Sequence, residues 1–420
     1  MNAPARRPRF FYGYNIIASA FVIQILTWGL YNSYGVFFSP LLDEFGWSRA
    51  TIAGAASVSQ FLVGVGAAFM GRLNDRFGPR LLMTYTGVMV GIGFFLMYWT
   101  SSVWQLYLFQ GFIVGIGISG VDVVLLSTTA RWFSRRRGMM SGIVKVGTGV
   151  GIVVAPLVLA WLISTSGWRQ TYLIVGITLF VLTVLAAQVL RRDPARMGLL
   201  PDGAPVRKVT DITRAEKGYA FREVLGQRAF WMMCLMFFST FFCTYSLIVH
   251  FAPAVVLFGQ TEAVGALMVS VLGGASIGGR LLLGFINDKI GSRRSMLLLL
   301  TVFVASFVLL QAATSVWLLA LFAVLYGFCH GGFYTLVSPL VAEYFGIRSH
   351  GAIFGIMIFC GGVGGSLGPF ITGAMVDASG SFAGPFLLLL GMAGLGLASI
   401  ALAGKAGPGP ASAEQAVTAG

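Results

Sequence analysis

The chain has 420 residues, of which 57% are hydrophobic and only 10% are charged, and its mean hydropathy is +0.85. A soluble globular domain carries about 25% charged residues, so this composition excludes a soluble protein. The formal net charge of +14 could suggest a nucleic-acid partner, but the positions of the basic residues argue against one.

Apolar runs long enough to cross a bilayer, which takes about 20 residues, recur along the whole chain. Because lipid cannot satisfy free backbone polar groups, each run must be helical. The sequence therefore predicts an all-α membrane protein. Its twelve transmembrane helices are expected at about 12–38, 50–71, 81–100, 104–131, 139–163, 170–190, 229–256, 263–287, 295–313, 316–343, 351–376 and 383–404. The basic start "MNAPARRPRF" precedes a run too long for a cleavable signal peptide.

The chain repeats itself. The loop "GRLNDRFGPR" (71–80) and the loop "GFINDKIGSR" (284–293) share Gly, Asn, Asp, Gly and Arg at an offset of 213 residues. The same offset relates Pro40 to Pro253 and Pro156 to Pro369. A constant offset predicts two six-helix bundles, residues 1–190 and 229–404. Between them, 191–228 is a polar, basic cytoplasmic linker, and 405–420 is predicted to be a disordered cytoplasmic tail.

The basic residues lie on one side of this predicted topology. Of the 28 Lys and Arg residues, 24 fall in the terminal segments and in alternate loops, whereas only Arg49 and Arg169 fall in the opposite loops. The positive-inside rule then places both termini in the cytoplasm of a cell-membrane protein. The net charge is thus explained without nucleic acid, and weak attraction to anionic membrane lipid follows from it.

Motifs of enzymes are missing from the sequence. It has no phosphate-binding loop, zinc signature or nucleophile elbow. The cysteines lie inside apolar runs without metal-ligand spacing: Cys234, Cys243, Cys329 and Cys360. We therefore expect neither an enzyme nor a cofactor or metal site.

The twelve-span layout and the repeated G-x-x-x-D-R-x-G-x-R loop resemble the major facilitator superfamily, as does "GWRQTY" (167–172). Within it, "FGWSRA" (45–50), "RWFSRRRGMMSG" (131–142) and an arginine in the eighth span are similar to the monocarboxylate transporter family, whose bacterial relatives include oxalate–formate exchangers. The resemblance implies a monomeric secondary transporter. It would work by a rocker-switch movement around one central site between two bundles.

Three charged residues lie deep in predicted spans: Asp122, Lys145 and Arg280. Counted from the cytoplasmic helix ends, their depths are about 13, 10 and 12 Å. Each would cost about 3 kcal/mol or more if it faced lipid, so each is expected to face water or another charge. Their formal charges add up to +1, which one bound carboxylate would neutralise.

Arg280 is the first candidate for binding the substrate anion, because its planar fork matches a carboxylate. The alternative is a structural ion pair with Asp122. Lys145 is a second candidate, although a lysine this shallow can also extend to the cytoplasmic surface. The remaining substrate-binding candidates are polar or aromatic residues within spans: Asn32, Tyr34, Tyr245, His330 and Tyr334.

Asp122 is the candidate for proton coupling. A bound anion would compete for Lys145 and Arg280 and so favour the protonated form of Asp122. Proton and anion would then bind together, which is symport. The alternatives are a structural polar contact for Asp122 and coupling through His330, since the ordinary pKa of a histidine lies near neutral pH.

The two repeated loops carry opposite charges at helix ends. The loop with Asp75 and Arg76 and the loop with Asp288 and Lys289 are expected to form a cytoplasmic gate. The two loops would pair when that face is closed and separate when it opens. The alternative is a rigid turn with ordinary surface ion pairs.

The match to the monocarboxylate transporter family is partial. Animal members carry an Asp four residues before the eighth-span Arg, where this chain has Ser276, and a Lys in the first span, which is absent here. Oxalate–formate exchangers carry a Lys in the eleventh span, also absent here. We expect a proton-linked carrier of a small monocarboxylate. An exchanger of dicarboxylates or other organic anions, a drug or vitamin carrier and a non-transporting sensor remain alternatives.

Overall fold

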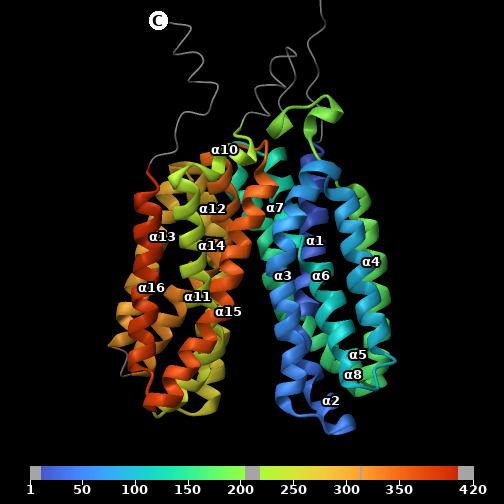
Figure 1. Ribbon diagram of the computed structural model, residues 1–420, viewed down its shortest axis with the longest axis vertical. Helices are drawn as coiled ribbons and strands as arrows, with labels where there is room; N and C mark the ends of the chain where they lie inside the picture. The colour runs from blue at the N-terminus through green and yellow to red at the C-terminus, as the bar shows by residue number, and fades with distance from the viewer. Residues whose placement is uncertain (1–10, 204–217, 313–314, 405–420) are drawn as a thin grey trace, which may run out of the picture. The chain divides into compact units, whose positions relative to one another are not determined.

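The computed structural model describes residues 11–203, 218–312 and 315–404 (Figure 1). They form two compact units. The described residues of unit 1 are 11–135, 143–203 and 350–355. Those of unit 2 are 136–142, 218–312, 315–349 and 356–404. The predicted tail and part of the predicted linker lie outside the described residues, and the predicted bundle boundaries stay a prediction.

Unit 1 is helical throughout its described residues. A 3₁₀ segment interrupts its first span, and its fourth span contains a π-helical turn, η2. The elements are α1 (Gly13–Asn32), η1 (Ser33–Phe37), α2 (Phe38–Phe45), α3 (Arg49–Phe77), α4 (Pro79–Met97), α5 (Val103–Leu106), η2 (Tyr107–Ile113), α6 (Val114–Ile118), α7 (Val121–Trp132), α8 (Arg137–Val189), η3 (Pro194–Met197) and η4 (Pro201–Gly203).

Unit 2 consists of six long helices preceded by one short helix. They are α10 (Phe221–Leu225), α11 (Arg228–Leu257), α12 (Glu262–Ile290), α13 (Ser292–Gln311), α14 (Val316–Phe345), α15 (His350–Ser379) and α16 (Ala383–Leu402). Helices α12 and α14 pack closely, because Gly327 and Gly331 of α14 lie against the backbone carbonyls of Leu272 and Ser276. Small residues permit this approach.

Eleven helices of the described chain are long and apolar enough to cross a membrane. One of them, α8, has 53 residues and would extend about 80 Å at 1.5 Å per residue, more than twice the hydrocarbon thickness of about 30 Å. Its backbone leaves the helical conformation at Gly167 (φ 79°, ψ 161°). Helix α8 therefore contains two spans, and the prediction of twelve transmembrane helices is confirmed.

The backbone confirms the internal duplication. Helices α3 and α12 begin and end 213 residues apart. Gly78 and Gly291, which precede α4 and α13, have φ values of 84° and 87°. Residues with a side chain rarely adopt this conformation, so the glycine of each repeated loop sets the turn that starts the next helix.

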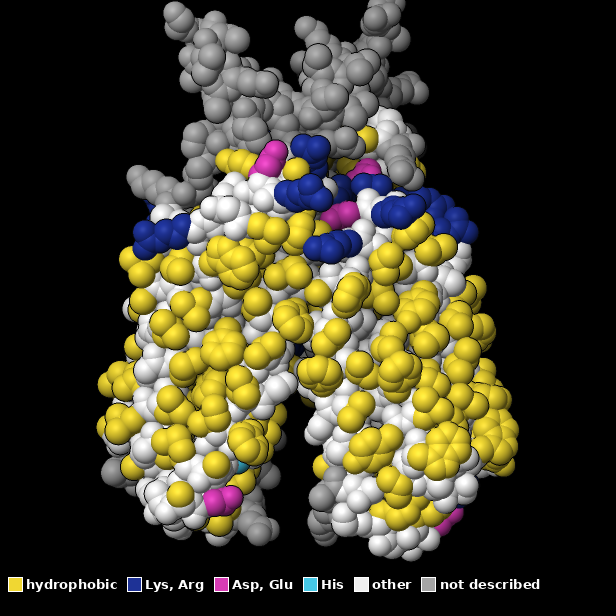
Figure 2. Space-filling view, in the orientation of Figure 1, with side chains coloured by type: hydrophobic (Ala, Val, Ile, Leu, Met, Phe, Trp, Pro, Cys, Tyr) yellow, Lys and Arg dark blue, Asp and Glu magenta, His cyan; other side chains and the backbone are white. Residues whose placement is uncertain are grey.

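Large apolar side chains lie on the outside of both units. Leu157 and Trp161 in unit 1 are 70% and 63% exposed, and Trp317 and Phe370 in unit 2 are 84% and 74% exposed. Figure 2 shows apolar side chains over the sides of each unit, with Lys and Arg side chains near one end of each unit. A surface of this kind suits hydrocarbon rather than water.

Candidate functional site

A polar cluster in unit 1 joins three helices, and we call Gln24, Asp122, Lys145 and Thr148 the coupling cluster. Lys145 Nζ lies 2.9 Å from Oδ1 and 3.1 Å from Oδ2 of Asp122. The Gln24 amide donates to Asp122 Oδ1 at 2.8 Å, and the Thr148 hydroxyl donates to Gln24 Oε1 at 2.6 Å. The carboxylate of α7 thus accepts hydrogen bonds from α1 and α8.

Two glycines bring α1 and α8 together at this cluster. A Cβ on Gly147 would lie 2.5 Å from the carbonyl oxygen of Phe21, and one on Gly151 would lie 2.5 Å from that of Ile25. Gly147 and Gly151 are four residues apart and share one face of the helix. Close backbone approach at this face holds Gln24 next to Thr148.

The charges of the cluster balance. The Lys145 side chain is 3% exposed and that of Asp122 is 16% exposed. An ion pair in this environment gains attraction but loses hydration. The Trp28 ring, with its centroid 5.8 Å from Lys145 Nζ, adds a cation–π contact. The cluster thus places one carboxylate and one ammonium group in direct contact inside unit 1.

Arg280 lies on α12 in unit 2 and is 3% exposed. The first turns of α8 belong to unit 2 and pack against this part of α12: Gly142 lies against the carbonyl oxygen of Arg280, and Gly138 against that of Gly284. The motif "RGMMSG" (137–142) therefore supports the backbone of the buried arginine.

His330 and Tyr334 belong to an aromatic row on α14. Tyr326 stacks with His330 at 6.1 Å between ring centroids, and His330 meets Tyr334 edge-on at 5.3 Å. Tyr334 also contacts Phe241 of α11 at 5.6 Å. Tyr245, the next predicted candidate, lies one turn after Phe241 at 5.8 Å. Thus the structure brings Tyr245, His330 and Tyr334 into one aromatic region of unit 2.

Asn32 and Tyr34 of unit 1 lie apart from the coupling cluster. The exposed Asn32 amide donates to the carbonyl of Trp28 in its own helix at 2.7 Å. The buried Tyr34 hydroxyl donates to the carbonyl of Ile52 at 3.1 Å. These bonds are local packing interactions, and no described contact joins either side chain to Asp122 or Lys145.

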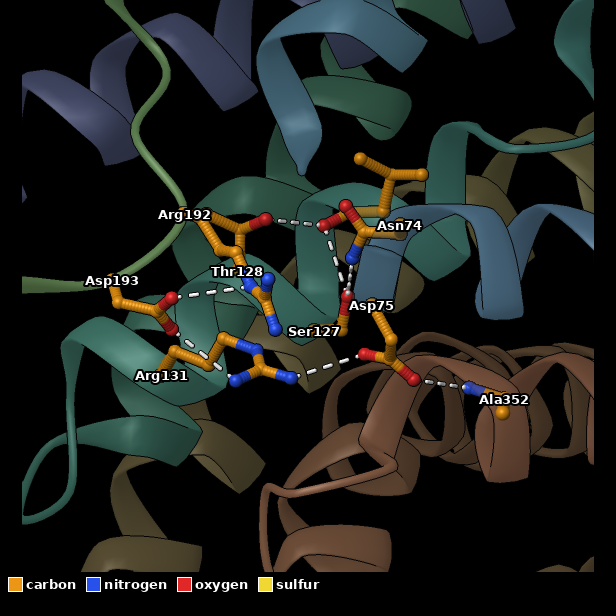
Figure 3. A network of polar contacts seen from close by, with 9 residues as sticks. Asn74, Asp75, Ser127, Thr128, Arg131, Arg192, Asp193 and Ala352 are labelled. Carbon is orange, nitrogen blue, oxygen red and sulfur yellow. Dashed lines mark hydrogen bonds and ion pairs between the residues drawn. The ribbon is translucent and has the colours of Figure 1, made fainter. Parts of the chain in front are cut away.

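Asp75, which is predicted to belong to a cytoplasmic gate, forms an ion pair with Arg131 (Figure 3). Arg131 of α7 lies 3.0 Å from Asp75 and 3.2 Å from Asp193. The second oxygen of Asp75 accepts a hydrogen bond of 3.0 Å from the backbone amide of Ala352, at the start of α15. Asp75 therefore combines a buried ion pair with a helix N-terminus, where negative charge is favoured.

Asp288 takes the equivalent place in unit 2. Its two oxygens accept hydrogen bonds from the backbone amides of Gly138 (2.7 Å) and Met139 (2.9 Å), at the start of α8. The exposed cations Arg76 and Lys289 lie over aromatic rings instead, 5.1 Å from the ring centre of Phe77 and 4.2 Å from that of Phe285.

Sequence reasoning missed Gln24, Thr148 and Arg131 as site residues. Gln24 is a fully buried amide in the first span, and a buried polar residue there was the available signal. Within the described residues, no group of three or more His, Cys, Asp or Glu is placed to hold a metal ion.

A family model of the major facilitator superfamily matches residues 20–300 and 257–418. The chain belongs to this superfamily. It is therefore a multi-pass membrane protein of a transporter family, and the resemblance expected from the sequence is confirmed.

Three comparisons indicate the range of its relatives. The oxalate:formate antiporter of Oxalobacter formigenes is 26% identical over 86% of this chain and 85% of its own length. Human monocarboxylate transporter 11 is 29% identical over 92% of this chain and 81% of its own. A structure of the proton:xylose symporter XylE has a TM-score of 0.75 at 15% identity, covering 93% of this chain and 94% of that one, and confirms the fold.

Proposed function

We propose that this transporter carries a small monocarboxylate, of the lactate or pyruvate kind, together with a proton across the cytoplasmic membrane by alternating access. The observation that carries the proposal is the ion pair between Asp122 and Lys145, 2.9 Å apart and inside membrane-spanning helices. Buried charges of this kind are costly in a membrane and mark ion or substrate pathways.

Charge balance supports one carboxylate as substrate. Lys145 and Asp122 neutralise each other, and Arg280 adds one positive charge within the membrane-spanning helices. Arg280 is our candidate for binding the carboxylate, since a guanidinium offers two parallel donors. The relatives named as monocarboxylate transporters support the same substrate class.

The coupling cluster supports proton linkage. If the substrate anion draws Lys145 away, Asp122 loses its main electrostatic partner and becomes easier to protonate. By reciprocity, protonation of Asp122 releases Lys145 and strengthens anion binding by the same coupling energy. A proton and a carboxylate then bind as a pair.

The second candidate is exchange of organic anions. The relative named as an oxalate:formate antiporter supports it. A dicarboxylate would require Asp122 to be protonated, because the charges of Lys145 and Arg280 would then match both carboxylates.

Uptake by proteoliposomes distinguishes the two. We expect labelled monocarboxylates to accumulate when the outside is acidified, and dicarboxylates to enter poorly. Uptake that is insensitive to the pH gradient but requires an organic anion inside the vesicles would support exchange instead.

We further propose that both termini face the cytoplasm. Asp75 and Asp288 would act as gate residues at that face, each holding a helix N-terminus, with Arg131 as the cation partner of Asp75.

A further inference from the structure

Helices α11 and α15 of unit 2 lie against each other and run in the same direction (Figure 1). Three contacting pairs share a separation of 126 residues: Phe238 with Gly364, Phe242 with Gly368, and Ser246 with Thr372. The first two are contacts of a glycine with a backbone carbonyl, and the third is a hydrogen bond of 3.1 Å between hydroxyls. A step of four residues thus links each contact to the next.

One more step toward the start of both helices reaches Cys234 and Cys360, which have the same separation. The same register therefore places the two thiols at facing positions of α11 and α15, and an electrostatic interaction links the two side chains. Cys234 is buried and Cys360 is partly exposed, so a small reagent has a route to the pair through Cys360.

The other two cysteines are arranged differently. The Cys243 thiol donates to the carbonyl of Leu389 at 3.3 Å, and the Cys329 thiol donates to that of Leu299 at 3.5 Å. Both are buried. Each thus has a backbone partner, and the two provide matched controls within the same unit.

We propose that Cys234 and Cys360 together form a two-thiol binding site for a thiophilic metal or metalloid ion. Soft thiolate ligands select such ions. Two metal–sulfur bonds of about 2.3 Å in a line span about 4.6 Å, a length that suits two thiols at facing positions of closely packed helices. Binding of a divalent ion such as Hg(II) releases both thiol protons and forms two metal–sulfur bonds, with no change in oxidation state. The bound ion ties α11 to α15.

The site is tested with phenylarsine oxide on the purified full-length protein. The arsenical condenses with two thiols, forming two arsenic–sulfur bonds and one water, again without redox change. We expect one adduct per chain by intact-protein mass spectrometry. It should survive excess 2-mercaptoethanol and be removed by 2,3-dimercaptopropanol, since only a dithiol can replace two bonds at once.

Variants locate the adduct. Cys234→Ala and Cys360→Ala should each abolish the 2-mercaptoethanol-resistant adduct, whereas the double variant Cys243→Ala/Cys329→Ala should keep it. Thermal unfolding of each variant checks that it is folded. A resistant adduct in folded Cys360→Ala, or none in wild type, would overturn the site. Pretreatment with one equivalent of Hg(II) should block labelling, and unchanged labelling would overturn binding of the metal ion.

Discussion

Lys145 donates to both carboxylate oxygens of Asp122, at 2.9 and 3.1 Å, and Gln24 donates to one of the same oxygens at 2.8 Å. The carboxylate therefore contacts a cation and an amide from two other segments of unit 1. Any proton that reaches Asp122 must compete with Lys145. The proposed coupling rests on this competition. The contribution of the pair to stability is measured separately, by substitution of Lys145 and Asp122.

Removal of Lys145 should destabilise the protein. Lys145→Met leaves the Asp122 carboxylate buried without its cation, at an expected cost of about 3 kcal/mol. Adding Asp122→Asn removes the buried carboxylate charge and should recover part of the lost free energy of unfolding. Thermal unfolding in detergent of both single variants and the double variant measures the coupling.

A matched control is the pair Glu44 and Arg169, 2.7 Å apart but 42% and 32% exposed. Because solvent screens exposed pairs, Glu44→Gln should cost less than about 1 kcal/mol. Equal destabilisation by Lys145→Met and Glu44→Gln would contradict the account of a buried pair.

Gln24 should act as a positioning residue for Asp122. Gln24→Leu removes one hydrogen bond to a charged group, worth about 1.5–3 kcal/mol, and leaves Thr148 without its acceptor. We expect transport to persist with an altered pH dependence of uptake. Thr27→Val is the control, because the Thr27 hydroxyl bonds only within its own helix, to Ile23 at 2.7 Å. Identical pH profiles for Gln24→Leu and wild type would remove Gln24 from the coupling cluster.

Arg280→Ala should abolish uptake while the protein remains in the membrane. Arg280→Lys should restore little, because an ammonium group cannot offer a planar pair of donors. The measurement is initial uptake by proteoliposomes at matched protein content, with Lys289→Ala, an exposed cation on the same helix, as control. Normal uptake by Arg280→Ala would exclude it as the anion site.

The gate proposal predicts an order among substitutions at the repeated loops. Asp75→Asn should slow turnover, because Asp75 pairs with Arg131, which is 5% exposed. Arg131→Gln should resemble Asp75→Asn, whereas Arg76→Gln should have little effect. Maximal rate and half-saturating substrate concentration are measured together. A large loss of affinity at unchanged maximal rate would argue against a gate.

Much of the fold was predictable from the sequence. Twelve apolar runs and the 213-residue repeat specify the helices and their turns, because backbone polar groups have no alternative partners in lipid. The two spans of α8 were separated correctly on either side of Gly167. The 3₁₀ segment at Ser33–Phe37 and the π-helical turn at Tyr107–Ile113 were not predicted, since hydropathy is insensitive to them.

The partners of the charged residues were harder to predict. The number of residues from each cytoplasmic helix end places Asp122 and Lys145 at similar depths in the membrane. It does not show how each helix is rotated about its axis. That rotation depends on close packing, such as Gly147 and Gly151 against α1, which brings Gln24 to the pair. For the same reason the sequence placed Asp75 at a charged helix end but did not reveal its contact with Arg131.

The central claim is that one proton moves with each monocarboxylate, and it is tested most directly by measuring both fluxes in one preparation. Proteoliposomes containing a trapped pH-sensitive dye receive labelled lactate outside, with protein-free liposomes as control for diffusion of the undissociated acid. We predict that wild-type protein acidifies the interior in proportion to label taken up, and that Asp122→Asn loses this acidification. Protein-dependent lactate uptake by the wild type without acidification would contradict the account.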